Sequence, residues 1–194
     1  MDYREALAHV ISLLYHRGLV QIRGGNASII DRSHDLIYIT PTGLPRTLIK
    51  PSDIAVIKLN GEKVEGVPSS EWRLHTEIYK MIREAKAIVH AHPPITIAFG
   101  EAGVDLDLSV TTEAGNNITC VSKIPPLKPG SIELAKETAN TMMREGCNVA
   151  LLRRHGIVAY SSKSIFHALD IIEALEDLAK TLICKKILNK YRGI

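Results

Sequence analysis

The chain has few of the residues that would assign it to a secreted or a membrane-bound class. Its three cysteines, Cys120, Cys147 and Cys184, are too few and too widely spaced for a disulfide framework or a thiolate zinc site. Their odd number fits a reducing compartment. No apolar run approaches the roughly 20 residues of a membrane span, and the charged residues near the start do not fit a signal peptide. We therefore expect a cytoplasmic protein without a membrane partner.

Glutamine and net charge are also scarce. Gln21 is the only glutamine, which is a compositional sign of a hot environment. The 24 Lys and Arg residues nearly balance the 21 Asp and Glu residues, and the charges are scattered, so nucleic acid is not an expected partner. With 45% hydrophobic residues, the chain is long enough to bury a core. We expect a single domain over residues 1–194.

The first third of the chain predicts one helix and then short strands. Apolar residues recur at helical spacing over residues 2–17, and Gly18 ends the pattern. The Asn60-Gly61 pair favours a tight hairpin turn. Strands are expected at residues 29–30, 36–39, 54–59 and 62–65. Four strands so close together predict a largely antiparallel sheet, not a doubly wound dinucleotide-binding fold.

The remainder of the chain predicts helices and strands in alternation. A helix opens at residues 68–71, where Ser69 or Ser70 would be the N-cap. His75 could pair with Glu71 on the helix surface, but we treat it as a structural residue by default. The helix that begins near Ser164 has a broad apolar face, and we expect part of it to meet another subunit. Other helices are expected at residues 95–100 and 131–145, and strands at residues 118–121, 149–152 and 157–160.

Residues 87–94 (Ala-Ile-Val-His-Ala-His-Pro-Pro) form an apolar run that ends in two histidines. If this run is a strand, His90 and His92 point to the same face and can reach one point in space. That point could hold a metal ion. An equal alternative from these eight residues alone is a pair of core histidines with ordinary hydrogen bonds.

A third histidine and a glutamate favour the metal interpretation. His155 follows directly after the predicted strand 149–152. Three imidazoles with an open fourth position are a catalytic arrangement for zinc, whereas sites closed by four protein ligands are usually structural. Glu71 could fill or guard the fourth position. Neutral imidazole ligands leave the ion its full charge, which favours a Lewis acid acting on a carbonyl or a hydroxyl.

Three polar loops could hold an anion near such a metal. Residues 23–28 combine two glycines with small polar residues, so their backbone N–H groups could approach a phosphate closely. Taken alone, this loop is better explained as a flexible turn into a strand. Residues 40–43 form a second polar loop. Ser69 and Ser70 stand at a helix start, where free N–H groups and the helix dipole suit a phosphate.

Five of these motifs, taken in order, resemble the motif set of the class II aldolase and adducin family. They extend from about residue 24 to residue 160, with the flanking helices also in place. Five motifs in one order are far more specific than any one of them. The motifs are residues 24–28, 39–43, 68–72, 89–92 and 154–156.

The resemblance implies an α/β fold of three layers, in which a central, mostly antiparallel mixed sheet lies between helices. It implies a homotetramer with active sites between subunits. By family likeness, one Zn²⁺ per subunit, or another divalent transition metal in its place, is held by His90, His92 and His155. Glu71 matches the residue that contacts the metal in the empty site and acts as acid and base. Residues matching those that hold a substrate phosphate are Gly25, Asn26, Thr42, Gly43, Ser69 and Ser70.

The activity implied by the resemblance is that of a lyase. A ketose 1-phosphate, of the L-fuculose 1-phosphate type, would be cleaved reversibly between C3 and C4 into dihydroxyacetone phosphate and an aldehyde such as L-lactaldehyde. Glu71 would transfer the proton at C3. The aldolases also use a tyrosine from a neighbouring subunit at the aldehyde oxygen, but residues 109–111 contain none, and Tyr191 is only loosely similar to a second family tyrosine.

Three alternatives remain within the same family. A ribulose-phosphate 4-epimerase would carry an aspartate where this chain has Glu71, and a Pro-Ser-Gly where it has residues 41–43 (Pro-Thr-Gly). A methylthioribulose-1-phosphate dehydratase would share the three histidines. An adducin-like structural module would have no catalysis, but the presence of all three histidines and of Glu71 argues against a dead site.

Overall fold

Eight strands form one sheet in the computed structural model, which describes residues 2–191. Their order across the sheet is β4-β3-β2-β1-β5-β8-β7-β6, and every neighbouring pair is antiparallel except β6 and β7. The strands are β1 (Asn26–Asp31), β2 (Leu36–Ile39), β3 (Ala55–Lys58), β4 (Lys63–Glu65), β5 (Ala87–Ala91), β6 (Val121–Ile124), β7 (Val149–Leu152) and β8 (Gly156–Ser161). The expectation of a mostly antiparallel mixed sheet is therefore confirmed.

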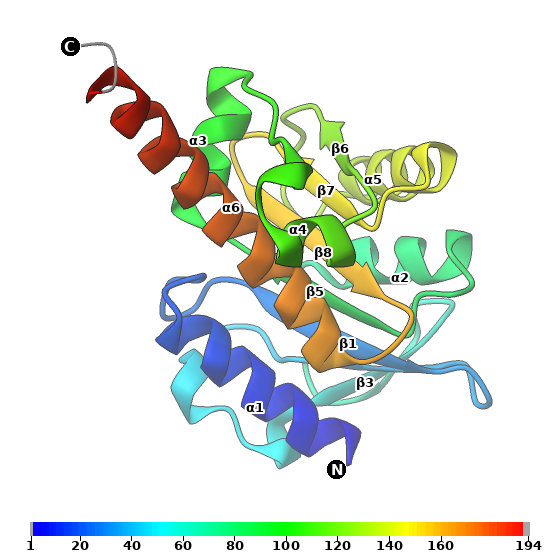
Figure 1. The fold of residues 1–194 in the computed structure, drawn as a ribbon. Helices are drawn as coiled ribbons and strands as arrows, with labels where there is room; N and C mark the ends of the chain where they lie inside the picture. Colours follow the sequence, from blue (N-terminus) through cyan, green and yellow to red (C-terminus); the bar gives the residue numbers. More distant parts are fainter. Residues whose placement is uncertain (1, 192–194) are drawn as a thin grey trace.

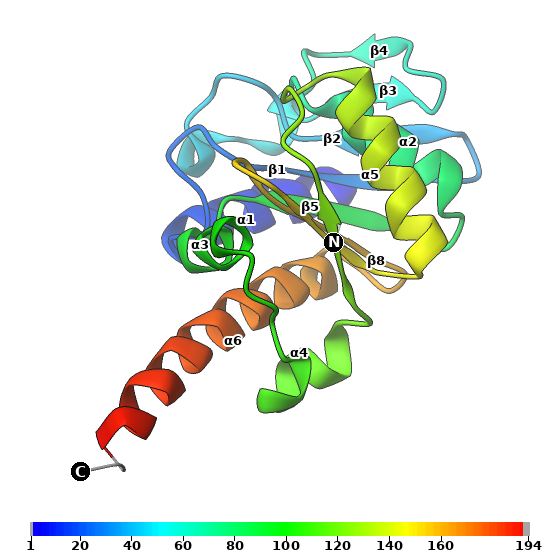
Figure 2. The ribbon, with the colours of Figure 1, turned by 90° about the horizontal axis from the view of Figure 1, so that it is seen from above.

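Helices cover both faces of the sheet, as Figures 1 and 2 show. On one face α1 and α6 pack over the central strands, with α3 and α4 beside α6; on the other, α2 packs against α5. The three predicted layers are thus present. The helices are α1 (Tyr3–His16), α2 (Trp72–Met81), α3 (Pro94–Ala102), α4 (Thr112–Asn117), α5 (Ile132–Glu145) and α6 (Ile165–Tyr191), with short 3-10 helices at Arg46–Leu48, Pro51–Asp53 and Leu108–Val110.

The local sequence explains most of the helix and strand ends. Gly18 follows α1 with a φ of 70°, and Gly61 adopts a φ of 94° in the turn between β3 and β4, so both take conformations that glycine favours. Ser131 caps α5 by accepting a hydrogen bond from the Leu134 N–H at 3.1 Å. Pro94 stands in the first turn of α3, where its missing N–H costs nothing.

The strand expected at residues 118–121 was wrong. β6 begins at Val121 and runs to Ile124, where it pairs in parallel with β7. Residues before it form α4, and the Thr119 backbone N–H and hydroxyl bond the Asn148 side chain instead of a strand. Side-chain hydrogen bonds of this kind compete with a ladder and delay the start of the strand.

The cysteines were predicted to form no disulfide framework, but two of them form a single disulfide. Cys120 and Cys147 form a disulfide that joins the segment before β6 to the turn after α5, and Cys184 is free and exposed. Disulfides are rare in reducing compartments, although intracellular proteins of hyperthermophiles are an exception. This contact could not be predicted from the spacing of the cysteines, because the parallel pairing of β6 and β7 brings them together.

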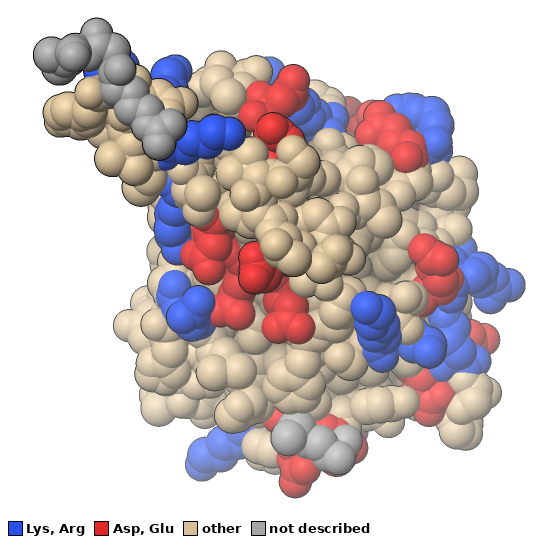
Figure 3. All heavy atoms as spheres, viewed as in Figure 1, with Lys and Arg blue, Asp and Glu red and all other residues tan. Residues whose placement is uncertain are grey.

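The surface is consistent with the balanced charge of the sequence. On the face drawn in Figure 3, no broad basic area is visible, and several acidic side chains lie together left of the centre. Among the residues that the structure describes, no helix is long and apolar enough to cross a membrane.

Candidate metal centre and phosphate loops

The centre of the sheet positions the three histidines. His90 lies on β5 between β1 and β8, opposite Asn26 on one side and Val158 on the other. His92 comes directly after β5, and His155 lies in the turn between β7 and β8. Gly156 makes this packing close, since a Cβ atom there would stand 2.3 Å from the Ala91 carbonyl oxygen.

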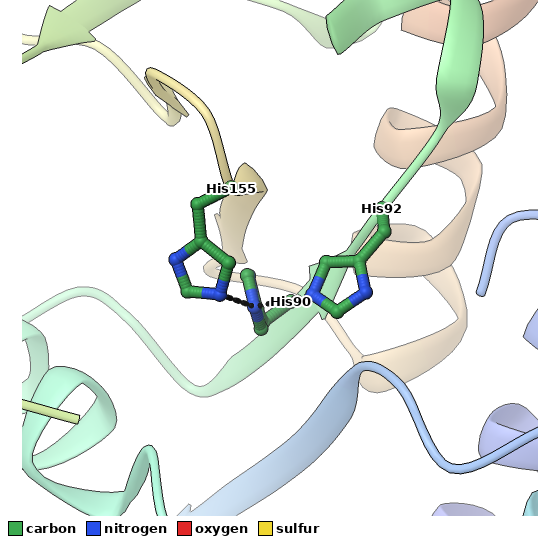
Figure 4. Close-up of side chains that lie close together, drawn as sticks. All are labelled: His90, His92 and His155. Atoms are coloured by element: carbon green, nitrogen blue, oxygen red, sulfur yellow. Dashed lines mark hydrogen bonds between the residues drawn. The ribbon is translucent and has the colours of Figure 1, made fainter. Parts of the chain in front are cut away.

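The three imidazoles turn toward one another, as Figure 4 shows. The Nε2 atom of His90 lies 3.1 Å from Nε2 of His92 and 3.3 Å from Nε2 of His155. Among the described residues, these three form the only group of at least three His, Cys, Asp or Glu side chains with ligand atoms within 4.8 Å of one another. The prediction that His90 and His92 reach one point, joined there by His155, is confirmed.

Hydrogen bonds on the far side of two rings fix which nitrogen faces the centre. His90 Nδ1 donates to the Ile157 carbonyl at 2.9 Å, and His92 Nδ1 donates to the Gln21 side-chain oxygen at 2.9 Å. In a neutral imidazole only one nitrogen carries a proton, so both Nε2 atoms face the centre with lone pairs. Two lone pairs 3.1 Å apart repel unless a proton or a cation lies between them. This donor set fits a divalent transition metal.

Burial keeps these histidines neutral at pH 7. It lowers the pKa of His90 well below its ordinary value and that of His92 to about 4, with the neighbouring imidazoles adding to both effects. Burial also lowers the pKa of His155. Neutral imidazoles are the form that binds a metal ion. The Nδ1 atom of His155 is buried and has no hydrogen-bond partner among the described residues.

Glu71 is buried just before α2 but is not a member of the histidine group. Its side chain is 7% exposed, and its Oε2 atom is buried without a hydrogen-bond partner among residues 2–191. Burial raises the pKa of this carboxyl, whereas the Gly130 N–H lowers it. The Gly130 carbonyl in turn accepts a bond from Arg73 at 3.3 Å, and sequence reasoning did not find this support. A carboxyl whose pKa is raised by burial is a candidate for proton transfer.

The three polar loops lie together at the same end of the sheet. The Pro41 and Pro68 backbones form a bridge, and the Ser69 N–H donates to the Thr40 carbonyl at 3.0 Å. This brings the 40–43 loop, with its exposed Thr42 and Gly43, against the serines before α2. Neither serine is the N-cap of α2, which is Glu71; instead, the Ser69 hydroxyl accepts a bond from the Glu71 N–H at 3.3 Å.

The first loop enters β1 through Gly25 and Asn26. Gly25 has a φ of 68°, and a Cβ atom there would stand 2.8 Å from the His90 carbonyl oxygen, so only glycine fits. Asn26 is 3% exposed, and its Oδ1 atom lies 2.5 Å from His75 Nε2. The candidate phosphate-binding residues of this loop therefore lie next to the candidate metal-binding residues of β5.

His75 has the structural role expected of it by default, and it does not pair with Glu71 on the helix surface. His75 is fully buried, because its ring turns inward between Asn26 and Ser28, with Nδ1 2.6 Å from the Ser28 hydroxyl. Burial lowers its pKa to about 3, so the ring is neutral and has one N–H. A ring that donates to Asn26 Oδ1 and accepts from Ser28 leaves the Asn26 amino group free to bind an anion.

Gln21 and Arg46 are two further residues that the sequence motifs did not indicate. Gln21 connects the first loop to His92, and Arg46 bonds backbone carbonyls of the 23–28 and 41–44 segments. Gln21 stands just before the glycine motif, and its uniqueness was the only available signal. Nothing in the sequence distinguishes Arg46 from a surface arginine.

Comparisons with known proteins agree on one family. The model of the class II aldolase and adducin N-terminal domain matches residues 5–183. An L-fuculose phosphate aldolase from Methanococcus maripaludis is 36% identical, covering 93% of this chain and 95% of the relative. A 5-deoxy-D-ribulose 1-phosphate aldolase from Bacillus thuringiensis is 30% identical, covering 91% of this chain and 82% of the relative.

Solved structures give the same result. A structure of L-fuculose 1-phosphate aldolase superimposes with a TM-score of 0.87 and 33% identity, covering 96% of this chain and 87% of the other. The L-fuculose-1-phosphate aldolase from Thermus thermophilus gives a TM-score of 0.83 at 25% identity, covering 97% of each chain. Sequence and structure comparisons thus both extend over nearly the whole length.

Proposed function

The chain belongs to the class II aldolase and adducin family, and on this premise we propose that it is a zinc-dependent aldolase that cleaves a ketose 1-phosphate. Aldolase-named relatives at 30–36% identity support the class of enzyme. The observation that carries the proposal is the set of histidine Nε2 atoms, 3.1 and 3.3 Å apart, that face one another. Glu71, whose Oε2 atom is buried without a hydrogen-bond partner among residues 2–191, is the candidate acid and base.

His90, His92 and His155 would hold the zinc ion, and Glu71 would contact it in the absence of substrate. When bound, the ion supplies a Lewis acid that polarises the C2 carbonyl of the ketose and lowers the energy of the charge that develops when the C3–C4 bond breaks. The three protein ligands leave a position open for substrate.

The protein's own residues would orient the sugar phosphate and move one proton. Gly25, Asn26, Thr42, Gly43, Ser69 and Ser70 would hold the phosphate. This fixes C3 next to Glu71, and such positioning is a large part of catalysis. Glu71 would protonate C3 in cleavage and remove the same proton in condensation, and its raised pKa suits both directions.

The sugar phosphates named for the Methanococcus and Bacillus relatives share their first three carbons and differ in the rest of the chain. Cleavage between C3 and C4 of a ketose 1-phosphate gives dihydroxyacetone phosphate in either case. A six-carbon 6-deoxy sugar such as L-fuculose 1-phosphate leaves lactaldehyde, and a five-carbon 5-deoxy sugar leaves acetaldehyde. We propose the L-fuculose 1-phosphate type, which most of the similar relatives share by name. Glu71 and the 41–43 sequence favour the aldolase over the epimerase.

Hydrogen exchange at C3 tests this proposal directly. Zinc-loaded protein is incubated with dihydroxyacetone phosphate in heavy water, and deuterium at C3 is followed by NMR. We expect stereospecific exchange of one proton by the wild type. Glu71→Gln should stop exchange while zinc remains bound, and Glu62→Gln, at an exposed position in the turn between β3 and β4, is the control that should exchange normally. No exchange by the wild type would overturn the aldolase and favour the epimerase or the dehydratase.

Assembly and compartment are part of the same proposal. We propose a single domain over the whole chain, a homotetramer and a cytoplasmic location. Tyr191 is 71% exposed at the end of α6, which projects away from the sheet, so it is free to contact a second copy. Whether it serves the aldehyde side of a neighbouring site remains a prediction.

A further inference from the structure

Arg46 is a cation held inside the protein by carbonyl oxygens alone. Its side chain follows the 40–44 loop and is 3% exposed. The guanidinium donates to the Gly24 carbonyl at 2.8 Å, to the Arg23 carbonyl at 2.6 Å and to the Pro41 carbonyl at 3.1 Å, with a longer contact of 3.5 Å to Leu44. Two loops that are distant in the sequence are thereby joined through one side chain.

The positive charge of this guanidinium is not compensated by a carboxylate. No Asp or Glu oxygen of residues 2–191 lies within the 4.0 Å of an ion pair from Arg46. Burial lowers its pKa, but a guanidinium stays protonated in proteins. A buried charge without an opposite charge normally destabilises a fold. An anion bound nearby would supply the missing partner.

The position of Arg46 points to the anion that the loops would bind. Its carbonyl partners are directly adjacent to Gly25 and Thr42, two of the proposed phosphate contacts. In a trans peptide the carbonyl and the following N–H point in opposite directions, so bonding of the Gly24 carbonyl turns the Gly25 N–H away from Arg46. That N–H has no acceptor among the described residues.

We propose that Arg46 is a positioning residue that fastens the two phosphate loops together and whose uncompensated charge makes the site selective for a dianionic phosphate ester. This inference rests on the proposed function, because it takes the loops as the phosphate site. Arg46 itself does not touch the substrate. It acts through the Gly24 and Pro41 peptide groups and through the electric field in a partly dry site.

Binding of inorganic phosphate and of dihydroxyacetone phosphate to the zinc-loaded full chain provides the test, by isothermal titration calorimetry. Arg46→Gln removes the charge but keeps N–H donors, and Arg46→Lys keeps the charge but loses the planar fork. We expect Arg46→Gln to weaken both ligands at least about tenfold, which corresponds to about 1.4 kcal/mol. Arg46→Lys loses part of the loop contacts but keeps the charge, so it should weaken both ligands less than Arg46→Gln does.

Arg32 offers a matched control. Its guanidinium also donates only to carbonyls, those of Tyr79, Ile82 and Ala85, but it lies between the end of β1 and the segment after α2. Arg32→Gln should lower the melting temperature without changing either dissociation constant. If Arg46→Gln bound both ligands as tightly as the wild type, or if the Gln and Lys variants lost the same affinity, the role of Arg46 would be refuted. The proposed aldolase function would not be affected by either result. Failure of the wild type to bind either ligand would overturn the phosphate site itself, and the inference with it.

Discussion

At the scale of single residues, the candidate metal centre depends on hydrogen bonds made by the histidine nitrogens that point away from it. Gln21 accepts the Nδ1 proton of His92 at 2.9 Å, which fixes both the ring orientation and the nitrogen left for the metal. Gly24 leaves room for this contact, since a Cβ atom there would stand 2.7 Å from the Gln21 oxygen and 2.9 Å from His92 Nδ1. The glutamine therefore belongs to the metal centre although it is not a ligand.

Gln21→Leu should weaken zinc binding by about 10–100-fold, the usual effect of losing a partner behind a metal ligand. Gln21→Glu keeps an acceptor for the same proton and should bind zinc nearly as the wild type does. Competition with a chromophoric chelator measures both affinities. The role assigned to Gln21 would be wrong if the leucine variant bound zinc as tightly as the glutamate variant.

His75 makes stability depend on pH. Its pKa is about 3 in the folded chain against an ordinary value of 6.5, because burial disfavours the charged ring. Below pH 6.5 the unfolded chain therefore binds a proton that the folded chain does not. The free energy of unfolding should fall by up to about 1.4 kcal/mol for each pH unit below 6.5, until pH approaches 3.

His75→Gln tests this dependence, because glutamine does not titrate. Urea unfolding of the zinc-free proteins at pH 7, 6 and 5 should show the stability advantage of the wild type shrinking as pH falls. Parallel pH curves for the two proteins would contradict a neutral, buried His75 and with it the argument for how Asn26 is oriented.

The sequence predicted the candidate metal ligands and the candidate acid and base better than it predicted the residues that hold them in place. His90 and His92 could be paired from strand alternation alone, and the motif order joined them to His155 and Glu71. Gln21, Arg46 and Gly130 could not be found in this way, because they act through contacts between segments that only the folded sheet brings together. A structural role was expected for His75, but its partners Asn26 and Ser28 were not, because a helical position specifies a face of the helix but not what covers that face.

At the scale of secondary structure elements, the packing of β5 against β8 sets the metal centre. The pair is antiparallel, with Ala91 opposite Ile157. Gly156 stands where the chain turns from His155 into β8, and an added Cβ atom would meet the Ala91 carbonyl oxygen at 2.3 Å and His92 Cδ2 at 2.7 Å. Any side chain at this position must therefore displace the end of β5.

Gly156→Ala should lower the free energy of unfolding by about 1–3 kcal/mol and disturb zinc binding, since overpacking moves His92. Gly115→Ala is the control: its Cβ atom would lie 3.5 Å from the nearest atom, in α4, where alanine stabilises a helix. Urea unfolding and bound zinc per chain are measured for both. Normal zinc content with normal stability in Gly156→Ala would contradict the close packing described.

The disulfide joins the segment before β6, where the predicted strand was misplaced, to the turn after α5. Cys120 and Cys147 are separated by 27 residues, and closing a loop of that length stabilises by about 3–4 kcal/mol in the chain-entropy estimate. Dithiothreitol should therefore lower the stability of the wild type but not of the Cys120→Ser/Cys147→Ser double variant. Alkylation of the unreduced, denatured chain should label Cys184 only; labelling of all three cysteines would refute the disulfide.

At the scale of the whole molecule, α6 is divided between two environments. Residues from Ile165 to Ala179 include the buried face that packs on the sheet, whereas the last turns extend beyond it. Apolar side chains remain exposed there: Ile183 is 38%, Ile187 49% and Leu188 62% exposed. Apolar residues grouped on an extended helix end usually mark contact with another chain. The first part of the broad apolar face predicted for this helix therefore packs in the core. The apolar side chains in its last turns are exposed.

If this surface joins the subunits of the proposed tetramer, native mass spectrometry of the wild type should show about 86 kDa, four times 21.4 kDa. The Ile187→Glu/Leu188→Glu double variant should give smaller species, because burying two carboxylates in an interface is costly. Both side chains are exposed within one chain, so the variant should still fold and bind one zinc per chain. Met143→Glu, 50% exposed on α5, is the control that should remain tetrameric. A wild type of 21.4 kDa, or a double variant of unchanged mass, would refute this use of α6.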